Sequence, residues 1–106
     1  MPRSALDDVA IAARLEETPG WAHEPGCLRR EFRFDDFAAA FRWMTRVAAE
    51  ADAMGHHPDW RNVYDTVDVR LSTHDIDGIS EDDFALARRM NALFATAGAD
   101  GPAAAS

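Results

Sequence analysis

The spacing of apolar residues changes along the chain and separates helical segments from strand-like ones. Between residues 35 and 54 apolar side chains recur every three or four positions, at Phe37, Ala40, Phe41, Met44, Val47, Ala48 and Ala51. This spacing places them on one stripe of an α-helix. We therefore predict a helix over residues 35–54 whose apolar stripe packs on a sheet, with Gly55 as the left-handed residue at its end.

Two other segments have the composition of β-hairpins. Residues 21–34 contain two short extended runs around the tripeptide Glu-Pro-Gly at residues 24–26, which favours a tight turn. Residues 62–73 are rich in β-branched side chains but exceed the length of an average strand, which is about five or six residues. We therefore predict a break near residues 65–66 that divides this segment into a second hairpin.

Polar capping residues mark two more helices. Ser4 is the predicted N-cap of the first, which the Pro-Gly pair at residues 19–20 should end. Ser80 is the predicted N-cap of the second, whose first turn carries the acidic residues 81–83. Gly98 should end that helix. The chain would then alternate helix, hairpin, helix, hairpin and helix.

This order of elements predicts an α+β fold in a single domain. We expect two layers, an antiparallel sheet of about four strands with about three helices packed on one face. The domain should span residues 1–106, with its core at about residues 5–97 and a disordered tail at about residues 99–106. A chain of this size buries only about two-thirds of its unfolded surface, so self-association as a homodimer or homotetramer would help to stabilise it.

Composition and charge exclude several classes of function. The net charge is −8 and Lys and Arg form no cluster, so neither nucleic acid nor an anionic membrane is an expected partner. Cys27 is the only cysteine, which excludes an intrachain disulfide and a cysteine-based zinc motif. The sequence shows neither an export signal nor an apolar run of about 20 residues that could span a bilayer. We therefore expect a cytoplasmic protein.

The candidate chemistry lies between residues 52 and 74, in the segment DAMGHHPDWRNVYDTVDVRLSTH. His56, His57 and His74 are three of the four histidines of the chain. Imidazole can act as both acid and base near neutral pH, so histidines gathered in one segment suggest proton transfer. Asp52 falls in the last turn of the predicted helix, where a carboxylate opposes the helix dipole, and this unfavourable placement also points to function.

Each candidate also has a purely structural interpretation. A histidine pair at a helix end can be a solvated terminus stabilised by the helix dipole. Aromatic residues such as Trp60 commonly fill small cores. Asp83 occupies a position where a carboxylate accepts N–H groups of the first helical turn. A metal site built on the three histidines is disfavoured, because adjacent side chains point apart and no His-x₃-His spacing is present.

This segment resembles the signature of the pterin-4a-carbinolamine dehydratase family. In that family an acidic residue precedes a histidine pair by four positions, an aromatic residue follows, and a histidine and an aspartate come at set distances. The matching residues here are Asp52, His56, His57, Pro58, Tyr64, His74 and Asp83. The flanks FRFDDFAAAFRWMTRVAAEA and LSTHDIDGISEDDFALA are also similar, so the likeness covers about residues 5–97. Asp52 stands where many relatives carry Glu, which leaves its role open.

The resemblance implies a cytosolic enzyme that dehydrates 4a-hydroxytetrahydropterin to quinonoid dihydropterin. This reaction restores the cofactor of aromatic amino-acid hydroxylases, so a hydroxylase could be a functional partner. The pterin would be the substrate, and neither a further cofactor nor a metal would be needed. Some relatives also act as dimerisation partners of a transcription factor through a helical surface, so a binding module on the same fold is the alternative.

The resemblance also implies roles for individual residues. His56 and His74 would transfer protons and His57 would chiefly bind the substrate, while Asp52 would orient or recharge His56 by a hydrogen bond. Asp83 would have a supporting role. The residues expected at the substrate are His56, His57, Pro58, Trp60, Thr73, His74, Asp75 and Ile76.

Overall fold

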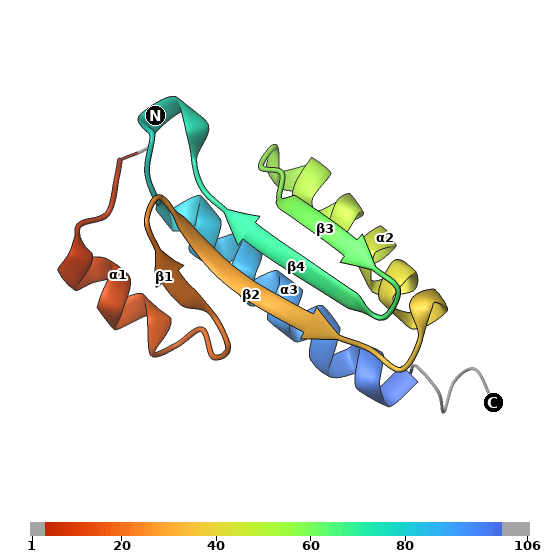
Figure 1. Cartoon of the computed structure of the whole chain (residues 1–106). Coiled ribbons are helices and arrows are strands. Elements are labelled where there is room, and N and C mark those ends of the chain that lie inside the picture. The colour runs from red at the N-terminus through yellow and green to blue at the C-terminus, as the bar shows by residue number, and fades with distance from the viewer. Residues whose placement is uncertain (1–3, 101–106) are drawn as a thin grey trace.

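The computed structural model describes the backbone of residues 4–100 and the side chains of residues 4–96. In chain order its elements are α1 (Asp8–Leu15), β1 (Ala22–Glu24), β2 (Cys27–Arg33), α2 (Phe37–Met54), β3 (Asp59–Val63), β4 (Thr66–Leu71), the short 3₁₀-helix η1 (His74–Ile76) and α3 (Glu81–Asp100). The strands form one antiparallel sheet in the order β1-β2-β4-β3, with α2 and α3 behind it and α1 beside β1 (Figure 1). The predicted α+β fold is confirmed.

The antiparallel pairing brings two loops to the same end of the sheet. Arg70, near the end of β4, lies opposite Asp59, the first residue of β3. The loop that enters β3, residues 55–58, therefore lies next to the chain that leaves β4 at residue 72. These two loops carry the three histidines singled out in the sequence. β3 begins ahead of the predicted residue 62, while the turn at residues 64–65 falls where the break was predicted.

The core lies between the sheet and the two long helices. Trp43 of α2 packs on β2, with its ring centroid 4.4 Å from that of Phe32 and 5.2 Å from that of Phe34. Burial of a large apolar side chain such as Phe32 contributes roughly 1.5–3 kcal/mol, so this contact is a main attachment of α2 to the sheet. The buried apolar residues are Ile11, Trp21, Leu28, Phe32, Ala40, Trp43, Val47, Ala51, Val67, Val69, Leu71, Ile79, Phe84, Leu86, Ala87 and Met90.

Part of the predicted stripe on α2 is wrong. The residues that α2 buries are Ala40, Trp43, Val47 and Ala51. Phe37 and Phe41 are 48% and 54% exposed, and Ala48 is exposed as well. The indole of Trp43 fills the space against β2 and so sets the rotation of the helix. Phe37 and Phe41 then fall outside the core and pack on each other, with ring centroids 5.7 Å apart.

The N-cap of α1 is Asp7 rather than the predicted Ser4. The Asp7 carboxylate accepts a hydrogen bond from the Ala10 N–H at 2.8 Å. The preceding residue, Leu6, donates its N–H to the carbonyl of Ile79, also at 2.8 Å. This contact ties Leu6 to the segment that precedes α3, and α1 begins after Asp7.

The predicted end of α3 at Gly98 is also wrong, because the helix continues to Asp100. A glycine inside a helix costs only about 1 kcal/mol relative to alanine, which by itself does not end a helix. Of the predicted disordered tail, residues 99–100 belong to α3 and residues 101–106 lie outside the described residues.

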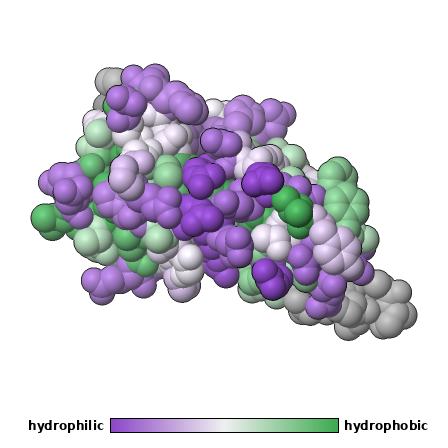
Figure 2. Space-filling view, viewed as in Figure 1, coloured by the Kyte–Doolittle hydropathy of each residue, from purple (hydrophilic) through white to green (hydrophobic). Residues whose placement is uncertain are grey.

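The open face of the sheet is polar. Figure 2 shows hydrophilic side chains across the middle of this face. Among them Arg29 of β2 makes two hydrogen bonds to Asp68 of β4, at 2.9 and 3.0 Å. In the described part of the chain no helix is both long enough and apolar enough to cross a membrane.

Candidate active site

A cavity of about 460 Å³ lies between the loop after α2 and the loop after β4. Pockets that hold small organic molecules have volumes of roughly 300–1,000 Å³. The cavity brings together the three histidines that the sequence singled out, although they come from different loops. Its lining consists of Gly55, His56, His57, Pro58, Asp59, Ser72, His74 and Asp75.

His56 is held in place by the end of α2. Gly55 adopts the predicted left-handed conformation, with φ at 65°, and closes the helix. The backbone N–H of His56 donates to the carbonyl of Ala51 at 3.1 Å. Pro58 has no N–H and prevents a further helical turn. The backbone at His56 is therefore fixed by the terminus of a helix that is itself anchored in the core.

The side chain of His56 is buried against Asp83. His56 Nε2 lies 2.6 Å from Asp83 Oδ1, and the two side chains are 6% and 0% exposed. The other carboxylate oxygen, Oδ2, accepts hydrogen bonds from Thr73 Oγ1 at 2.8 Å and from the backbone N–H of Ser80 at 2.9 Å. A carboxylate buried in this way is stable only when its oxygens are hydrogen-bonded, and this one has three donors.

The same contacts begin α3. Ser80 Oγ accepts from the Asp82 N–H at 3.3 Å, and Asp83 accepts from the Ser80 N–H, which is the reciprocal arrangement of a capping box. The prediction that Ser80 caps this helix is confirmed. The two interpretations of Asp83 are therefore compatible, because the same carboxylate caps α3 and contacts His56.

The contact with Asp83 assigns the ring nitrogens of His56. Because a carboxylate only accepts hydrogen bonds, Nε2 carries a proton in the neutral and in the charged imidazole. Nδ1 then remains as the nitrogen through which the ring can take up or release a proton. Asp83 thus orients His56 in the way that a hydrogen-bonded carboxylate orients the histidine of other acid–base sites.

Asp52 does not contact His56 as predicted. It lies beside His57, with Asp52 Oδ1 at 3.4 Å from His57 Nε2. The side chains of His57 and Asp52 are 64% and 86% exposed, so their attraction is weakened by solvent. The difference arises because Asp52 projects from the solvent side of α2, whereas His56 turns inward toward the start of α3.

His74 stands on a small closed loop. The backbone N–H of Thr73 donates to the carbonyl of Gly78 at 2.7 Å, and the Gly78 N–H donates back at 3.3 Å. His74 and Asp75 lie inside this loop and line the cavity together with His56 and His57. The bridge between Thr73 and Gly78 fixes where they stand.

Three residues expected at the substrate are not among those that line the cavity. Trp60 belongs to the rim of the core, with its ring centroid 6.3 Å from that of Trp43. The hydroxyl of Thr73 points to Asp83. Within residues 4–96, the side chains that line the cavity do not include Trp60, Thr73 or Ile76. The predicted aromatic wall at Trp60 is therefore not part of the cavity.

The cavity also contains two residues that the sequence did not single out, Asp59 and Ser72. Both flank predicted motif residues, and only the pairing of β3 with β4 shows that they meet. With Asp75, Asp59 gives the lining two carboxylates, whereas no lysine or arginine of the described chain lines it. Among the described residues, no group of three or more His, Cys, Asp or Glu side chains could hold a metal ion.

Comparison with known proteins finds one matching family and several similar relatives. The family model described as pterin 4 alpha carbinolamine dehydratase matches residues 4–93. Two bacterial relatives carry the name "Putative pterin-4-alpha-carbinolamine dehydratase". The one from Mesorhizobium japonicum is 49% identical over 96 residues, which is 89% of this chain and 98% of the relative. The one from Afipia carboxidovorans is 50% identical over 95 residues, which is 88% of this chain and 95% of the relative.

Two solved structures share the fold. A transcriptional coactivator/pterin dehydratase from Brucella melitensis superposes with a TM-score of 0.83 at 37% identity, covering 85% of this chain and 98% of that one. A pterin dehydratase-like protein identified as a RuBisCO assembly factor in the alpha-carboxysome superposes with a TM-score of 0.59 at 24% identity, covering 70% and 86%. The second likeness concerns the fold alone.

Proposed function

The chain belongs to the pterin 4 alpha carbinolamine dehydratase family, and we propose that it dehydrates a 4a-hydroxytetrahydropterin to the quinonoid dihydropterin in the cytoplasm, as a step of tetrahydropterin recycling. In this reaction the C4a–O bond breaks, N5 loses its proton, a C4a=N5 double bond forms and the hydroxyl group leaves as water. The observation that carries the proposal is the meeting of His56, His57 and His74 at one cavity, with His56 fixed on Asp83.

The reaction needs an acid at the hydroxyl group and a base at N5, because hydroxide is a poor leaving group. We assign the acid to His56, which would deliver a proton from Nδ1 while Nε2 stays bonded to Asp83. His74 would accept the proton of N5. A well-placed acid or base contributes about 10²–10⁴-fold to the rate, so each histidine should matter strongly and neither should account for the whole effect.

The remaining residues of the cavity would bind the pterin. His57 is exposed and has Asp52 beside it, which suits a residue that holds the substrate at the mouth of the cavity. The amino group and N3–H of the pterin ring are hydrogen-bond donors, and the carboxylates of Asp59 and Asp75 offer acceptors for them. Backbone groups of residues 73–76 could pair with the same edge of the ring.

A dehydration assay tests the proposal. The loss of 4a-hydroxytetrahydropterin is followed by absorbance with and without the purified protein, and the protein should accelerate it well above the uncatalysed rate. We also expect chelator-treated protein to keep full activity, because the histidines act as proton carriers. A decay rate equal to that of buffer would contradict the proposed function. Activity that chelation removes and zinc restores would contradict the assignment of the histidines.

A second candidate function is a binding module on the same fold. The observation that favours it is the exposure of Phe37 and Phe41 on α2, which a monomeric enzyme would not need. A protein that shows no dehydration but binds a helical partner would favour this alternative.

A further inference from the structure

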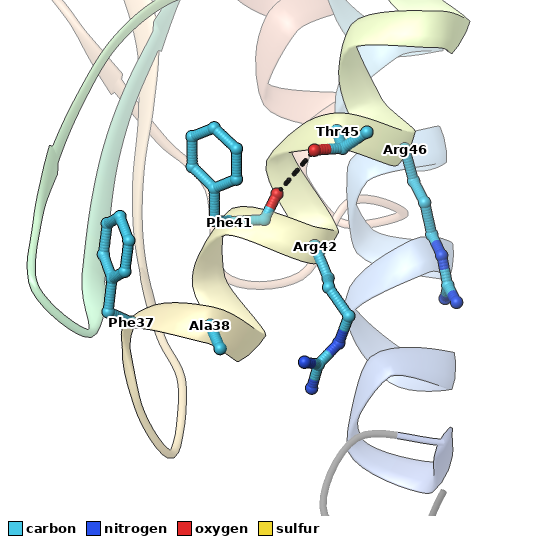
Figure 3. A pocket seen from close by; sticks show the side chains of 6 residues that line it. All are labelled: Phe37, Ala38, Phe41, Arg42, Thr45 and Arg46. Carbon is cyan, nitrogen blue, oxygen red and sulfur yellow. Dashed lines mark hydrogen bonds between the residues drawn. The ribbon is translucent and has the colours of Figure 1, made fainter. Parts of the chain in front are cut away.

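Thr73 differs from other threonines of the chain in the partners of its hydroxyl. The hydroxyl of Thr18 donates to the carbonyl of Arg14 at 2.7 Å, and that of Thr45 donates to the carbonyl of Phe41 at 2.9 Å (Figure 3). A bond to a carbonyl four residues earlier is a common use of a threonine hydroxyl in or beside a helix. The hydroxyl of Thr73 bonds instead to two side chains around the start of α3, so it connects separate elements of the fold.

The hydrogen bonds of Thr73 run in one direction. Thr73 Oγ1 lies 2.8 Å from Asp83 Oδ2 and 2.7 Å from Ser80 Oγ. A hydroxyl has one proton to donate, and an ionised carboxylate only accepts. The proton of Thr73 therefore points to Asp83, and Ser80 donates its own proton to Thr73. The two hydroxyls form a chain of donors that ends on the carboxylate in contact with His56.

This chain of hydroxyls is buried. Thr73 and Ser80 are 1% and 2% exposed, and Asp83 is fully buried. The side chain of Thr73 does not line the cavity, so a substrate bound there would not meet its hydroxyl. Within residues 4–96 no buried side-chain nitrogen or oxygen lacks a hydrogen-bond partner. Loss of the Thr73 hydroxyl would leave Asp83 Oδ2 with the Ser80 N–H and would remove the acceptor of the Ser80 hydroxyl.

The backbone of Thr73 supports the other histidine of the proposed proton transfer. Its N–H donates to the carbonyl of Gly78 at 2.7 Å, and its carbonyl accepts from the N–H groups of Ile76 and Gly78, both at 3.3 Å. These bonds close the loop that carries His74. Thr73 therefore lies where the support of His56 and the loop of His74 meet.

We propose that Thr73 is a positioning residue that couples the two histidines. Its hydroxyl holds the Asp83 carboxylate, which orients His56, and its backbone holds the loop of His74. This inference rests on the proposed dehydratase function. It assigns the Thr73 side chain to the support of the reacting groups, in place of the substrate contact that the family resemblance implied.

Two substitutions in the full chain test the role of the hydroxyl. Thr73→Val keeps the shape of the side chain without the hydroxyl, and Thr73→Ser keeps the hydroxyl. In the dehydration assay Thr73→Val should lower kcat by about 10–30-fold and leave KM within about twofold, because the hydroxyl positions a reacting group and does not bind the substrate. Thr73→Ser should keep kcat within about threefold of the wild type. An unchanged kcat with a raised KM in Thr73→Val, or an equal loss in Thr73→Ser, would overturn the proposal.

Thr18→Val is the matched control. Thr18 is also fully buried with a hydrogen-bonded hydroxyl, but it does not line the cavity or contact Asp83. Urea unfolding should show that Thr18→Val lowers the free energy of unfolding, as Thr73→Val does, while its kcat and KM stay at wild-type values. A loss of kcat in Thr18→Val equal to that in Thr73→Val would show that general destabilisation causes both, and it would overturn the proposal.

A double variant tests whether Thr73 acts through Asp83. In the Asp83→Asn protein the orientation of His56 is already impaired, so Thr73→Val should lower kcat by less than about threefold further. In the His57→Ala protein, where Asp83 is intact, Thr73→Val should keep its full effect of about 10–30-fold. Equal effects in the two backgrounds would show that Thr73 does not act through Asp83.

NMR of the unliganded protein gives a readout that does not depend on turnover. In nitrogen-15-labelled wild type the Nε2–H of His56 should give a slowly exchanging proton signal, because this group is buried on Asp83. Thr73→Val should shift and broaden that signal, and Thr73→Ser and Thr18→Val should preserve it. An inactive wild type with this pattern of signals would refute the dehydratase function and leave the support of His56 by Thr73 standing. An active protein in which Thr73→Val changes neither kcat nor the signal would refute the role of Thr73 alone.

Discussion

At the scale of single residues, the sequence identified the histidines but not the partner that orients His56. His56 and Asp83 are 27 positions apart and meet only because the start of α3 packs against the end of α2. No local pattern shows such a contact. Asp52, one helical turn before His56, was the partner that local spacing favoured, and the structure instead places it in solvent beside His57.

The Asp83 contact predicts a variant phenotype. Asp83→Asn keeps the size of the side chain, but its amide has one acceptor oxygen where the carboxylate has two. The amide therefore cannot accept all the hydrogen bonds from His56, Thr73 and Ser80. We expect the dehydration rate to fall by about 10–100-fold, as for other partners that orient a functional histidine. The free energy of unfolding should fall by about 1–3 kcal/mol. Steady-state kinetics and urea unfolding measure the two effects.

The comparison variant is Asp52→Asn. Its carboxylate is exposed and its contact with His57 is long, so its loss should cost less activity than the loss of Asp83. If Asp52→Asn lowered kcat more than Asp83→Asn did, the assignment of Asp83 as the residue that orients His56 would be wrong.

His57 should behave as a binding residue. Its side chain is 64% exposed and lies at the cavity without a buried partner holding its ring. A residue that binds the substrate and the transition state equally affects KM rather than kcat. His57→Ala should therefore raise KM and leave kcat within about threefold of the wild type. A large loss of kcat with unchanged KM would show instead that His57 transfers a proton.

At the scale of elements, turn and capping signals located most helices and strands. Both hairpins and the start of α3 lie where Glu-Pro-Gly, residues 65–66 and Ser80 placed them. The rotation of α2 could not be predicted in the same way, because apolar side chains occupy two of its faces and spacing alone does not say which is buried. The fit of Trp43 against β2 decides this, and that fit depends on the sheet.

The cross-strand pair of Arg29 and Asp68 predicts a pH dependence of stability. Hydrogen bonding to Arg29 lowers the pKa of Asp68 below its ordinary value, so the folded state favours the ionised carboxylate. The stability that the ionised Asp68 carboxylate contributes is fully present above the ordinary carboxyl pKa of about 4. This stability is lost as the pH falls through the lower pKa of the folded state. Because both groups are partly exposed, Asp68→Asn should cost about 0.5–1 kcal/mol at pH 7.

That difference should shrink as the pH falls below the ordinary carboxyl pKa of about 4, and it should disappear once the carboxyl group is protonated in both states. Urea unfolding of the wild type and Asp68→Asn from pH 7 to pH 2.5 measures it. Glu31→Gln provides the control, since Glu31 lies opposite Asp68 on the same open face and the structure shows no ion pair for it among the described residues. A destabilisation of Asp68→Asn that stays constant across the pH range would contradict the ion-pair explanation.

Gly20 should be a sensitive position in the turn before β1. Its φ is +89°, and a Cβ atom there would lie 2.6 Å from the guanidinium of Arg30. Arg30 cannot move freely, because it donates to the Pro19 carbonyl at 3.0 Å and to Asn91 Oδ1 at 2.7 Å. Gly20→Ala should therefore lower the free energy of unfolding by about 2–3 kcal/mol, from backbone strain together with displacement of Arg30.

Gly26→Ala separates the two causes. Gly26 also has a positive φ, +79°, but a Cβ atom there would have open space. Gly26→Ala should therefore lower the free energy of unfolding only through backbone strain, by about 1 kcal/mol. Equal losses for the two variants in urea unfolding would show that the contact with Arg30 does not contribute.

At the scale of the whole molecule, the order of elements was enough to predict the fold class, because two hairpins alternating with helices can bury their apolar faces in few ways. The location of the site follows from the sheet, whose antiparallel order brings the loops around His56 and His74 to one end. The composition of the cavity could not be predicted, since Asp59 and Ser72 meet only through the pairing of β3 and β4.

The central claim is that His56 and His74 carry the proton transfers of pterin dehydration. The most direct test is the maximal rate of 4a-hydroxytetrahydropterin loss for the double variant His56→Ala with His74→Ala, measured beside the wild type and protein-free buffer. Each single variant should lose about 10²–10⁴-fold, and the double variant should approach the rate in buffer. A folded double variant that keeps a rate within about tenfold of the wild type would contradict the claim.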